Sequence, residues 1–580
     1  MKTSSSLNNI RLSRILSATA PNKVFVAILF GGISGLAYSL IIPLILLSLQ
    51  DPLPRLLSAQ EANSFYLFGN IEVSKPKIAL AFLLVCIFIL LSRSASQIIL
   101  TRLATDVAVD FRKMLYHRIV QLPIRDLETI GPSRLLAAVT TDIPQIVSAA
   151  GVFPRILINS SILLGLLGYL FYLNIEIFYF IIGMMVFGSL TYRIPFILGE
   201  RFMAKARNCH DVLQEGLRGL IYGAKDLKIN KDRRWDFLEK KLEDVEENLR
   251  SYQKKGDSLV LFGVTYGDMI GFFSIGTVTF IMVNYHSFSK DILFGTVTVM
   301  LYITGPISMI INSIGPIIQA GVSKRKLEKL LNEMPIENYH ATSKLPNFDS
   351  IELKNITYMY SRKQNEEDSF RVGPINLVFN RGEIIFLTGG NGSGKSTLAK
   401  LISLHYIPEQ GEISFGSNIV TDENRDALRQ SISAIYSDFY LFTELFGFND
   451  RDIDYVANMY IDDLGLRGKV SIKEGKFSTT ELSDGQKKRL ALLIAYLEDR
   501  EIFIFDEWAA DQDPKFKGIF YKKIIPSLIK MNKIVIVISH DDRYFDNADK
   551  LIKMSAGKVI DVKQYVNGDL SSISHLDTYT

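Results

Sequence analysis

Cysteine is nearly absent from this sequence, whose 580 residues include only Cys86 and Cys209. Cys86 lies in an apolar run and Cys209 in a charged one, so we do not expect them to pair. A disulfide framework and a CxxC zinc site are therefore excluded. An excess of one charge is also lacking, because 65 basic residues oppose 61 acidic ones and leave a net charge of +4. That near balance gives no electrostatic support for nucleic-acid binding.

Long uncharged runs, by contrast, are present in the first half of the chain. Val24–Leu49 and Ile292–Ser323 contain no charged residue, and each exceeds the roughly 20 apolar residues that cross a bilayer as a helix. A wholly soluble protein is therefore excluded. Four more spans complete a prediction of six membrane helices: Ile78–Thr101, Ile156–Ile175, Ile177–Tyr192 and Ser258–Val283.

Basic residues predict the orientation of these helices. Arg11, Arg14 and Lys23 precede the first span, and the Lys- and Arg-rich segment Arg193–Asp257 follows the fourth. The loops after the third and fifth spans have almost none, so we expect both termini in the cytoplasm. The first span is too long for a cleavable signal peptide and no small-residue cleavage site follows it. We therefore expect it to remain as an anchor.

Two cytoplasmic segments, Arg102–Gly151 and Arg193–Asp257, are long and have helical apolar spacing interrupted by proline or glycine. They predict membrane helices that continue into the cytosol, turn at cross-pieces near Ile124–Gly131 and Gly223–Lys228, and return. An arm of twenty residues would extend by about 30 Å. Ordinary cytosolic loops are the alternative, although structureless loops of this length are uncommon.

Asp268 lies within the fifth predicted span. A charged side chain at the bilayer centre costs roughly 2.5–3.5 kcal/mol on insertion scales, which argues against a lipid-facing position. Two interpretations remain open: Asp268 lines a central aqueous cavity that could hold substrate, or it is paired structurally, with Arg93 as the candidate. Gly305-Pro306 and Gly315-Pro316 in the sixth span indicate kinks rather than hinges.

The composition changes after Ser323. We expect a charged helix from Lys324 through Leu331, followed by a linker to about Asp349. Fully apolar strand-like runs then alternate with helical segments, which is typical of a mostly parallel α/β sheet. These runs are Ile384–Leu387, Ile502–Phe505 and Ile534–Ser539.

A GxxxxGK[ST] motif follows the first of these strands and opens a helix. Its glycines let backbone N–H groups turn toward phosphates, Lys395 can reach the β- and γ-phosphates, and Ser396 can ligate Mg²⁺. The predicted nucleotide-binding residues are Gly389, Asn391, Gly392, Ser393, Gly394, Lys395, Ser396 and Thr397.

An acidic pair follows the second strand. Asp506 fits the Mg²⁺-binding carboxylate of P-loop enzymes, and Glu507 is placed to accept a proton from an attacking water. His540 ends the third strand and could contact the γ-phosphate, although a strand-end histidine alone is usually structural.

A second candidate phosphate-binding surface is the string Leu482-Ser483-Asp484-Gly485-Gln486, which precedes a helical segment. A serine, a glycine backbone and a helix N-terminus supply suitable donors. The string resembles the signature motif of ATP-binding cassette (ABC) proteins, with Asp484 where glycine is usual. The order of P-loop, signature, acidic pair and histidine is highly specific for that family.

The chain therefore resembles a bacterial ABC exporter half-transporter along nearly its whole length. The resemblance implies a membrane all-α domain of six helices at residues 1–330, a linker at 331–349, and an α/β P-loop ATP-binding cassette at 350–580. Three strings resemble the subfamily that exports cyclic peptides and siderophore peptides, including syringomycin, pyoverdine and microcin-related exporters. They are Glu215–Leu220, Ser437–Phe442 and Asp506–Pro514.

Further site residues follow from this resemblance. Tyr360 would stack on adenine, with a core tyrosine as the alternative, and Asp511 would belong to the D-loop. Ser437 occupies the place of a glutamine that in most cassettes touches Mg²⁺. Ser437 could act through a water, or Asp438 could substitute for the glutamine.

The resemblance also implies a mechanism. ATP and Mg²⁺ would lie between the P-loop of one cassette and the signature of another, so we expect a homodimer in the bacterial inner membrane. Glu507, His540 and Lys395 would carry out hydrolysis, and alternating access would export a peptide-like substrate. A broad multidrug or lipid exporter, an ATP-switched sensor and a heterodimer are the alternatives. Import is not expected, because importers usually place their cassettes on separate chains.

Overall fold

The computed structural model describes most of the chain as two compact units. We name Met1–Leu115 with Leu136–Leu331 the helical unit, and Tyr116–Leu135 with Asn332–Thr580 the α/β unit. Arg11, Arg14 and much of the predicted linker lie outside the described residues. The described residues are 21–49, 65–67, 71–73, 75–286, 288–337, 347–360, 370–448, 452–566 and 569–572.

Twelve helices of the described residues build the first part of the chain. They are α2 (Pro21–Ser39), α3 (Ile41–Leu49), α4 (Pro76–Val120), α5 (Ile124–Ile130), α6 (Pro132–Ala137), α7 (Ile143–Leu173), α8 (Ile175–Tyr222), α9 (Ala224–Ile229), α10 (Lys231–Phe237), α11 (Asp244–Gly276), α12 (Lys290–Asn312) and α13 (Ile314–Asn332). Between the first two spans, β1 (Phe65–Leu67) pairs antiparallel with β2 (Ile71–Val73).

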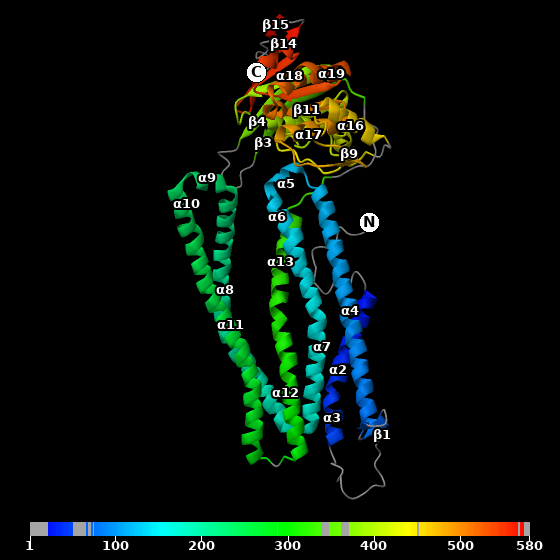
Figure 1. Cartoon of the computed structure of the whole chain (residues 1–580), viewed down its shortest axis with the longest axis vertical. Coiled ribbons are helices and arrows are strands. Elements are labelled where there is room, and N and C mark those ends of the chain that lie inside the picture. Colours follow the sequence, from blue (N-terminus) through cyan, green and yellow to red (C-terminus); the bar gives the residue numbers. More distant parts are fainter. Residues whose placement is uncertain are drawn as a thin grey trace. The chain divides into compact units, whose positions relative to one another are not determined.

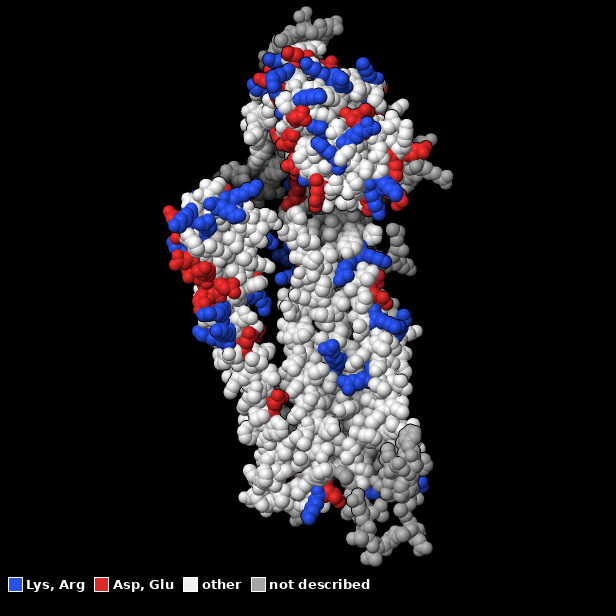
Figure 2. Space-filling model, viewed as in Figure 1, with Lys and Arg blue, Asp and Glu red and all other residues white. Residues whose placement is uncertain are grey.

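These helices form six spans that are long and apolar enough to cross a membrane, counted over the described residues. Each overlaps one predicted span, so the six-helix prediction is confirmed. On the face in view, Figure 2 shows charged side chains gathered toward the α9–α10 end of the helical unit, and few at its opposite end. The spans are Pro21–Ser48, Pro76–Val120, Pro132–Leu173, Ile175–Tyr222, Lys231–Asn284 and Lys290–Asn332.

Residues 102–151 and 193–257, the two long segments that the sequence predicts to be cytoplasmic, are largely helical rather than ordinary loops. α4 has 45 residues and α8 has 48, which gives each a length of about 70 Å. α8 packs along α11, and the short α9 and α10 close this pair at one end (Figure 1). The short helices α5 and α9 stand at the two predicted cross-pieces.

Small residues allow the membrane helices to approach closely. A Cβ atom on Gly35 of α2 would lie 2.6 Å from the Cβ of Ser161 on α7, so glycine permits this contact. The buried Ser96 hydroxyl of α4 donates a hydrogen bond to the carbonyl oxygen of Ala27 on α2 at 2.7 Å. Asn174 caps α8 by accepting hydrogen bonds from two backbone N–H groups, which fixes the tight turn between the third and fourth spans.

The prediction of a new charged helix beginning at Lys324 is wrong. α13 begins at Ile314 and continues through Lys324 to Asn332, so the charged segment is the end of the sixth span. A helix can change from apolar to charged residues without a break when no residue within it forces one. The break lies earlier, at Ser313, and Pro316 therefore falls in the first turn of α13, where proline is tolerated.

The α/β unit is built on a seven-stranded sheet with the order β15-β14-β13-β5-β12-β11-β8. Five of its strands are parallel to their neighbours, and β14 and β15 are antiparallel, which confirms the mostly parallel sheet. Its strands are β5 (Ile384–Gly389), β8 (Ile432–Ile435), β11 (Ile502–Asp506), β12 (Ile534–Ile538), β13 (Lys550–Ser555), β14 (Lys558–Val566) and β15 (Asp569–Ser572).

Side chains of β5 alternate between two cores on opposite faces of this sheet. Ile385 and Leu387 pack with residues of α14 (Lys395–Ile402), and Ile384 and Phe386 pack with residues of α17 (Asp484–Glu498). Burial on both faces explains why such strands are continuous apolar runs. The other helices are α15 (Arg425–Arg429), α16 (Ile453–Asp463), α18 (Pro514–Ile519) and α19 (Ile525–Lys530).

Two smaller antiparallel sheets complete the α/β unit. The larger has the order β4-β3-β6-β7, and the other pairs β9 with β10. Their strands are β3 (Ser350–Met359), β4 (Arg371–Asn380), β6 (Gln410–Phe415), β7 (Asn418–Ile419), β9 (Ile472–Lys473) and β10 (Lys476–Phe477).

Candidate nucleotide-binding site

The P-loop connects β5 to α14 at the carboxyl end of the parallel strands. Its glycines at 389, 392 and 394 have φ angles of 149°, 74° and 101°, which residues with a side chain rarely adopt. A Cβ atom on Gly389 would also lie only 2.8 Å from the hydroxyl oxygen of Ser393. The loop therefore has the sharp turns that its glycines predict.

Lys395 is buried in the first turn of α14. Its ammonium group donates hydrogen bonds to the carbonyl oxygens of Gly389 at 2.9 Å and Gly390 at 3.1 Å. Burial lowers the pKa of Lys395, although the nearby carboxylates of Glu507 and Asp506 oppose the shift.

The buried hydroxyl of Ser393 has no hydrogen-bond partner among the described residues. A buried polar group in a native structure normally has a partner. A lysine held by its own loop and an unsatisfied hydroxyl in the same glycine-rich turn both fit a ligand that carries phosphate groups.

Asp506 ends β11 and is buried, close to Ser396. Burial and the neighbouring charge of Glu507 raise the pKa of Asp506, while a hydrogen bond with Ser396 and the charge of Lys395 oppose the shift. A hydroxyl and a carboxylate oxygen side by side are the ligand types that Mg²⁺ prefers in such sites. Ser396 and Asp506 are therefore placed as the predicted Mg²⁺ ligands require.

Glu507 follows with a left-handed backbone, at φ 50°, which is uncommon for a residue with a side chain. Its N–H donates to the carbonyl of Ile538 in β12 at 3.1 Å, and its carbonyl accepts a hydrogen bond from Lys488 at 2.8 Å. In this conformation Glu507 Oε1 lies 3.3 Å from His540 Nε2. Both residues line one hollow beyond the ends of β11 and β12. The structure therefore brings together two residues that the sequence places 33 positions apart.

The signature residues begin α17. Ser483 is its N-cap and forms a capping box with Gln486: Ser483 Oγ accepts a hydrogen bond from the N–H of Gln486, whose side chain accepts one from the N–H of Ser483. Leu482 is partly buried and packs on the core that α17 covers. Asp484 is exposed, with its carboxylate 3.4 Å from the Lys487 ammonium.

A close backbone contact explains why position 485 is a glycine, and the motif alone did not reveal this contact. A Cβ atom there would lie 2.5 Å from the carbonyl oxygen of Asp511, so the segment after Glu507 passes directly over the start of α17. The side-chain amide of Gln512 donates to the carbonyl of Gly485 at 2.8 Å. The predicted D-loop and the signature therefore contact each other within one chain.

Basic residues on α17, whose role the sequence analysis missed, reinforce this contact. Lys488 is buried, and its ammonium lies 2.6 Å from the carboxylate of Asp511. The indole N–H of Trp508 donates to the carbonyl of Lys488 at 2.8 Å. Arg489 lies 2.6 Å from the Asp513 carboxylate. The available signal was the run of basic residues behind the signature together with the two acids after Trp508.

Tyr360 lies beside the P-loop helix. Its hydroxyl is 3.1 Å from Thr397 Oγ1 and donates to the Tyr406 hydroxyl at 3.4 Å. Tyr358, two residues earlier, is fully buried and stacks on Tyr406 with ring centroids 4.7 Å apart. Tyr358 is therefore the core tyrosine of β3. Tyr360, which follows β3, is half-buried and contacts Thr397.

Ser437 and Asp438 lie exposed on the segment after β8. Within the described chain, neither side chain makes a hydrogen bond. The charge of Asp438 contributes to the raised pKa of Asp506, which places Asp438 near the predicted metal ligand. Asn391 is exposed on the P-loop turn.

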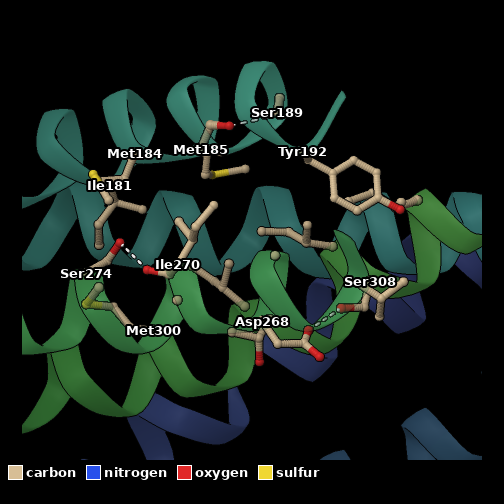
Figure 3. A pocket seen from close by; sticks show the side chains of 18 of the residues that line it. Ile181, Met184, Met185, Ser189, Tyr192, Asp268, Ile270, Ser274, Met300 and Ser308 are labelled. Atoms are coloured by element: carbon tan, nitrogen blue, oxygen red, sulfur yellow. Dashed lines mark hydrogen bonds between the residues drawn. The ribbon is translucent and has the colours of Figure 1, made fainter. Parts of the chain in front are cut away.

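Asp268 lines a pocket within the helical unit, between α8, α11 and α12 (Figure 3). Its carboxylate accepts a hydrogen bond from the hydroxyl of Ser308 at 3.2 Å. None of the ion pairs of the described residues joins it to Arg93, the candidate partner in the sequence analysis.

Comparison with known proteins agrees with these two units. Residues 25–194 match the model of the ABC transporter transmembrane region, and residues 372–510 match the model described as ABC transporter. The ATP-binding protein SyrD of Pseudomonas syringae pv. syringae is 31% identical over 571 residues, which cover 96% of this chain and 97% of SyrD. The chain is an ABC exporter half-transporter.

Other relatives of this ABC exporter differ in how much of it they cover. The alpha-hemolysin translocation ATP-binding protein HlyB of Escherichia coli O6:H1 is 29% identical over 260 residues, which cover 42% of this chain and 35% of HlyB. The ATP-dependent lipid A-core flippase of Paraburkholderia xenovorans is 23% identical over 512 residues, covering 81% and 80%. The exporter is thus a multi-pass membrane protein that uses ATP hydrolysis to drive transport.

Proposed function

We propose that this exporter moves a peptide-like cargo, such as a cyclic peptide, a lipopeptide or a peptide siderophore, across the bacterial inner membrane as a homodimer. The observation that carries the proposal is the similarity to SyrD over 96% of the chain, together with the three strings that resemble peptide exporters. The similarity to the alpha-hemolysin translocation protein supports a polypeptide cargo. Both termini are proposed to be cytoplasmic, on the side of the cassettes.

Hydrolysis would use the residues gathered around the P-loop. The loop backbone and Lys395 would hold the phosphates, and Ser396 and Asp506 would hold Mg²⁺, which would supply positive charge against the phosphates. Glu507 accepts the proton of the attacking water. His540, 3.3 Å from Glu507, orients the Glu507 side chain and contacts the terminal phosphate. Tyr360 would stack on the adenine ring of ATP.

Dimerisation follows from the distribution of these elements. One chain carries one P-loop and one signature, and the signature hydrogen bonds described above remain within α17 and the segment after Glu507. Ser483 and Gly485 would therefore complete the site of a second copy. Closure of two cassettes around ATP would shift the membrane helices between two states through α5 and α9.

The test is the ATPase rate of the full-length protein in nanodiscs, with and without a panel of cyclic and linear peptides. We expect stimulation by cyclic or lasso-like peptides. Glu507→Gln serves as the blank and should bind ATP without turning it over. Wild-type turnover in that variant would remove Glu507 from the role of base, and indifference to all peptides would contradict the proposed cargo.

A lipid exporter is the second candidate, because the lipid A-core flippase is similar over 81% of the chain. The same assay separates the two. Stimulation by lipids or hydrophobic dyes, with no response to peptides, would favour this candidate.

A further inference from the structure

The pocket between α8, α11 and α12 is a small cavity of the helical unit. Its volume is about 140 Å³, below the roughly 300–1,000 Å³ of sites that enclose a whole drug-sized ligand, so it would hold one part of a larger cargo. Its walls are mainly apolar, and three methionines (Met184, Met185 and Met300) line them (Figure 3). Methionine side chains are flexible and polarisable, so such walls adapt to apolar bodies of different shapes.

Two glycines of α11 form part of the pocket wall. Gly267 and Gly271 both line the pocket. A Cβ atom on Gly271 would lie 2.8 Å from Cγ2 of Thr304 on α12, so the two helices meet closely there.

Asp268 is the one charged residue among those that line the pocket, which include no Lys, Arg or His. Its hydroxyl partner Ser308 is neutral and donates a single hydrogen bond at 3.2 Å (Figure 3). One neutral hydrogen bond leaves the negative charge uncompensated, and the exposed carboxylate of Asp268 is open to a cation.

We propose that this pocket binds the cargo through a cationic amino group that pairs with Asp268, while the apolar body of the cargo packs against the methionines. This inference rests on the export function proposed above and names its substrate class: an amphipathic molecule that carries a primary ammonium group. A neutral cargo of the same shape leaves the carboxylate unpaired. The pocket therefore selects against a neutral cargo by the missing attraction.

The experiment uses two matched probe pairs with the full-length protein in nanodiscs. The first pair is a backbone-cyclised hexapeptide with one lysine and its Nε-acetylated form. The second contains no peptide: it is a dodecylamine that carries a dansyl group at the far end of its chain and keeps its free amino group, and the corresponding alcohol. For each probe, the concentration that gives half-maximal ATPase stimulation is measured.

In the wild type, we expect the amine of each pair to act at about tenfold lower concentration than its neutral form, which corresponds to about 1.4 kcal/mol. Asp268→Asn keeps an oxygen that accepts the Ser308 hydrogen bond but removes the charge, and should bring that ratio close to one. Ser308→Ala keeps the charge and should retain the preference. Asp257→Asn, on the same helix but outside the pocket, is the matched control and should retain both the preference and the basal rate.

The outcomes separate this inference from the proposed function. If peptides stimulate the enzyme but the amine and neutral forms act equally, the inference fails while peptide export stands. If only the non-peptide pair stimulates, and its amine preference disappears in Asp268→Asn, the inference stands while peptide export fails. An amine preference that survives in Asp268→Asn would overturn the role of Asp268, and a lack of response to all four probes would overturn both proposals.

Discussion

The carboxylate of Glu128, on the cross-piece helix α5, accepts a hydrogen bond from the hydroxyl of Tyr406 in the α/β unit. Burial and this bond to Glu128 raise the pKa of Tyr406, so its hydroxyl remains protonated and keeps donating. The same Glu128 carboxylate lies 2.6 Å from the ammonium of Lys400. Tyr406 also accepts a hydrogen bond from Tyr360, which contacts Thr397. A continuous chain of side chains thus joins α5 to the first turn of the P-loop helix.

Removing the charge of Glu128 should weaken the coupling between cargo binding and hydrolysis. Glu128→Gln retains the size of the side chain but loses the ion pair with Lys400, and the pair is partly exposed, so we expect a stability loss of only about 1 kcal/mol or less. Cargo-stimulated ATPase should fall by a larger factor than the basal rate. Tyr406→Phe should reproduce the effect, because it breaks the chain while keeping the stacked ring. If both rates fell equally with a lower melting temperature, Glu128 would have only a structural role.

Lys488 and Lys487 are adjacent on α17, but substituting Lys488 should reduce stability and ATPase activity more than substituting Lys487. Lys488 is buried and bonds both Asp511 and the carbonyl of Glu507, so Lys488→Met should cost about 1–3 kcal/mol and reduce ATPase activity by releasing the left-handed backbone of Glu507. Lys487 makes only a more exposed pair with Asp484, and Lys487→Met should change stability by less than about 0.5 kcal/mol. Melting temperature and ATPase rate in nanodiscs measure both. Equal effects of the two substitutions would contradict the bracing role of Lys488.

Gly485 should not tolerate even a methyl group. In Gly485→Ala the new Cβ would lie 2.5 Å from the carbonyl oxygen of Asp511, so the segment after Glu507 must move and ATPase activity should fall at least about tenfold. Gly518→Ala is the matched control, since nothing lies within 4 Å of a Cβ there. Alanine favours helices over glycine by roughly 0.5–1 kcal/mol, so this control should be neutral or stabilising. A wild-type rate in Gly485→Ala would show that the contact is not required.

The sequence was most informative where one local pattern is sufficient. Apolar runs of about membrane length predicted the six spans, and glycine spacing predicted the P-loop, because each depends on neighbouring residues. The change from apolar to charged residues at Lys324 predicts the start of a helix, but such a change does not require a break, and α13 runs through Lys324. Contacts such as that between Glu128 and Tyr406, which are 278 positions apart, have no local signature. They depend on how α5 packs against the rest of the α/β unit.

His405 should make stability depend on pH. Burial, and then the charge of Arg429, lower the pKa of His405 to about 4, and its Nδ1 lies 2.8 Å from Ser403 Oγ and 3.0 Å from the Tyr436 hydroxyl. An unfolded histidine has a pKa of about 6.5. Between those two values the unfolded state binds more protons, so the folded state loses stability as pH falls from about 6.5 to about 4, and not further below.

The loss attributable to His405 would approach about 3 kcal/mol at the acidic end of that window. His405→Gln has no group that titrates there, so its melting temperature should fall less than that of the wild type between pH 7 and pH 4.5. His210→Gln, which removes an exposed histidine of α8, controls for the loss of an imidazole and should keep the wild-type profile. If the melting temperatures of His405→Gln and the wild type fell equally between pH 7 and pH 4.5, the buried imidazole would contribute nothing to the acid sensitivity of the fold.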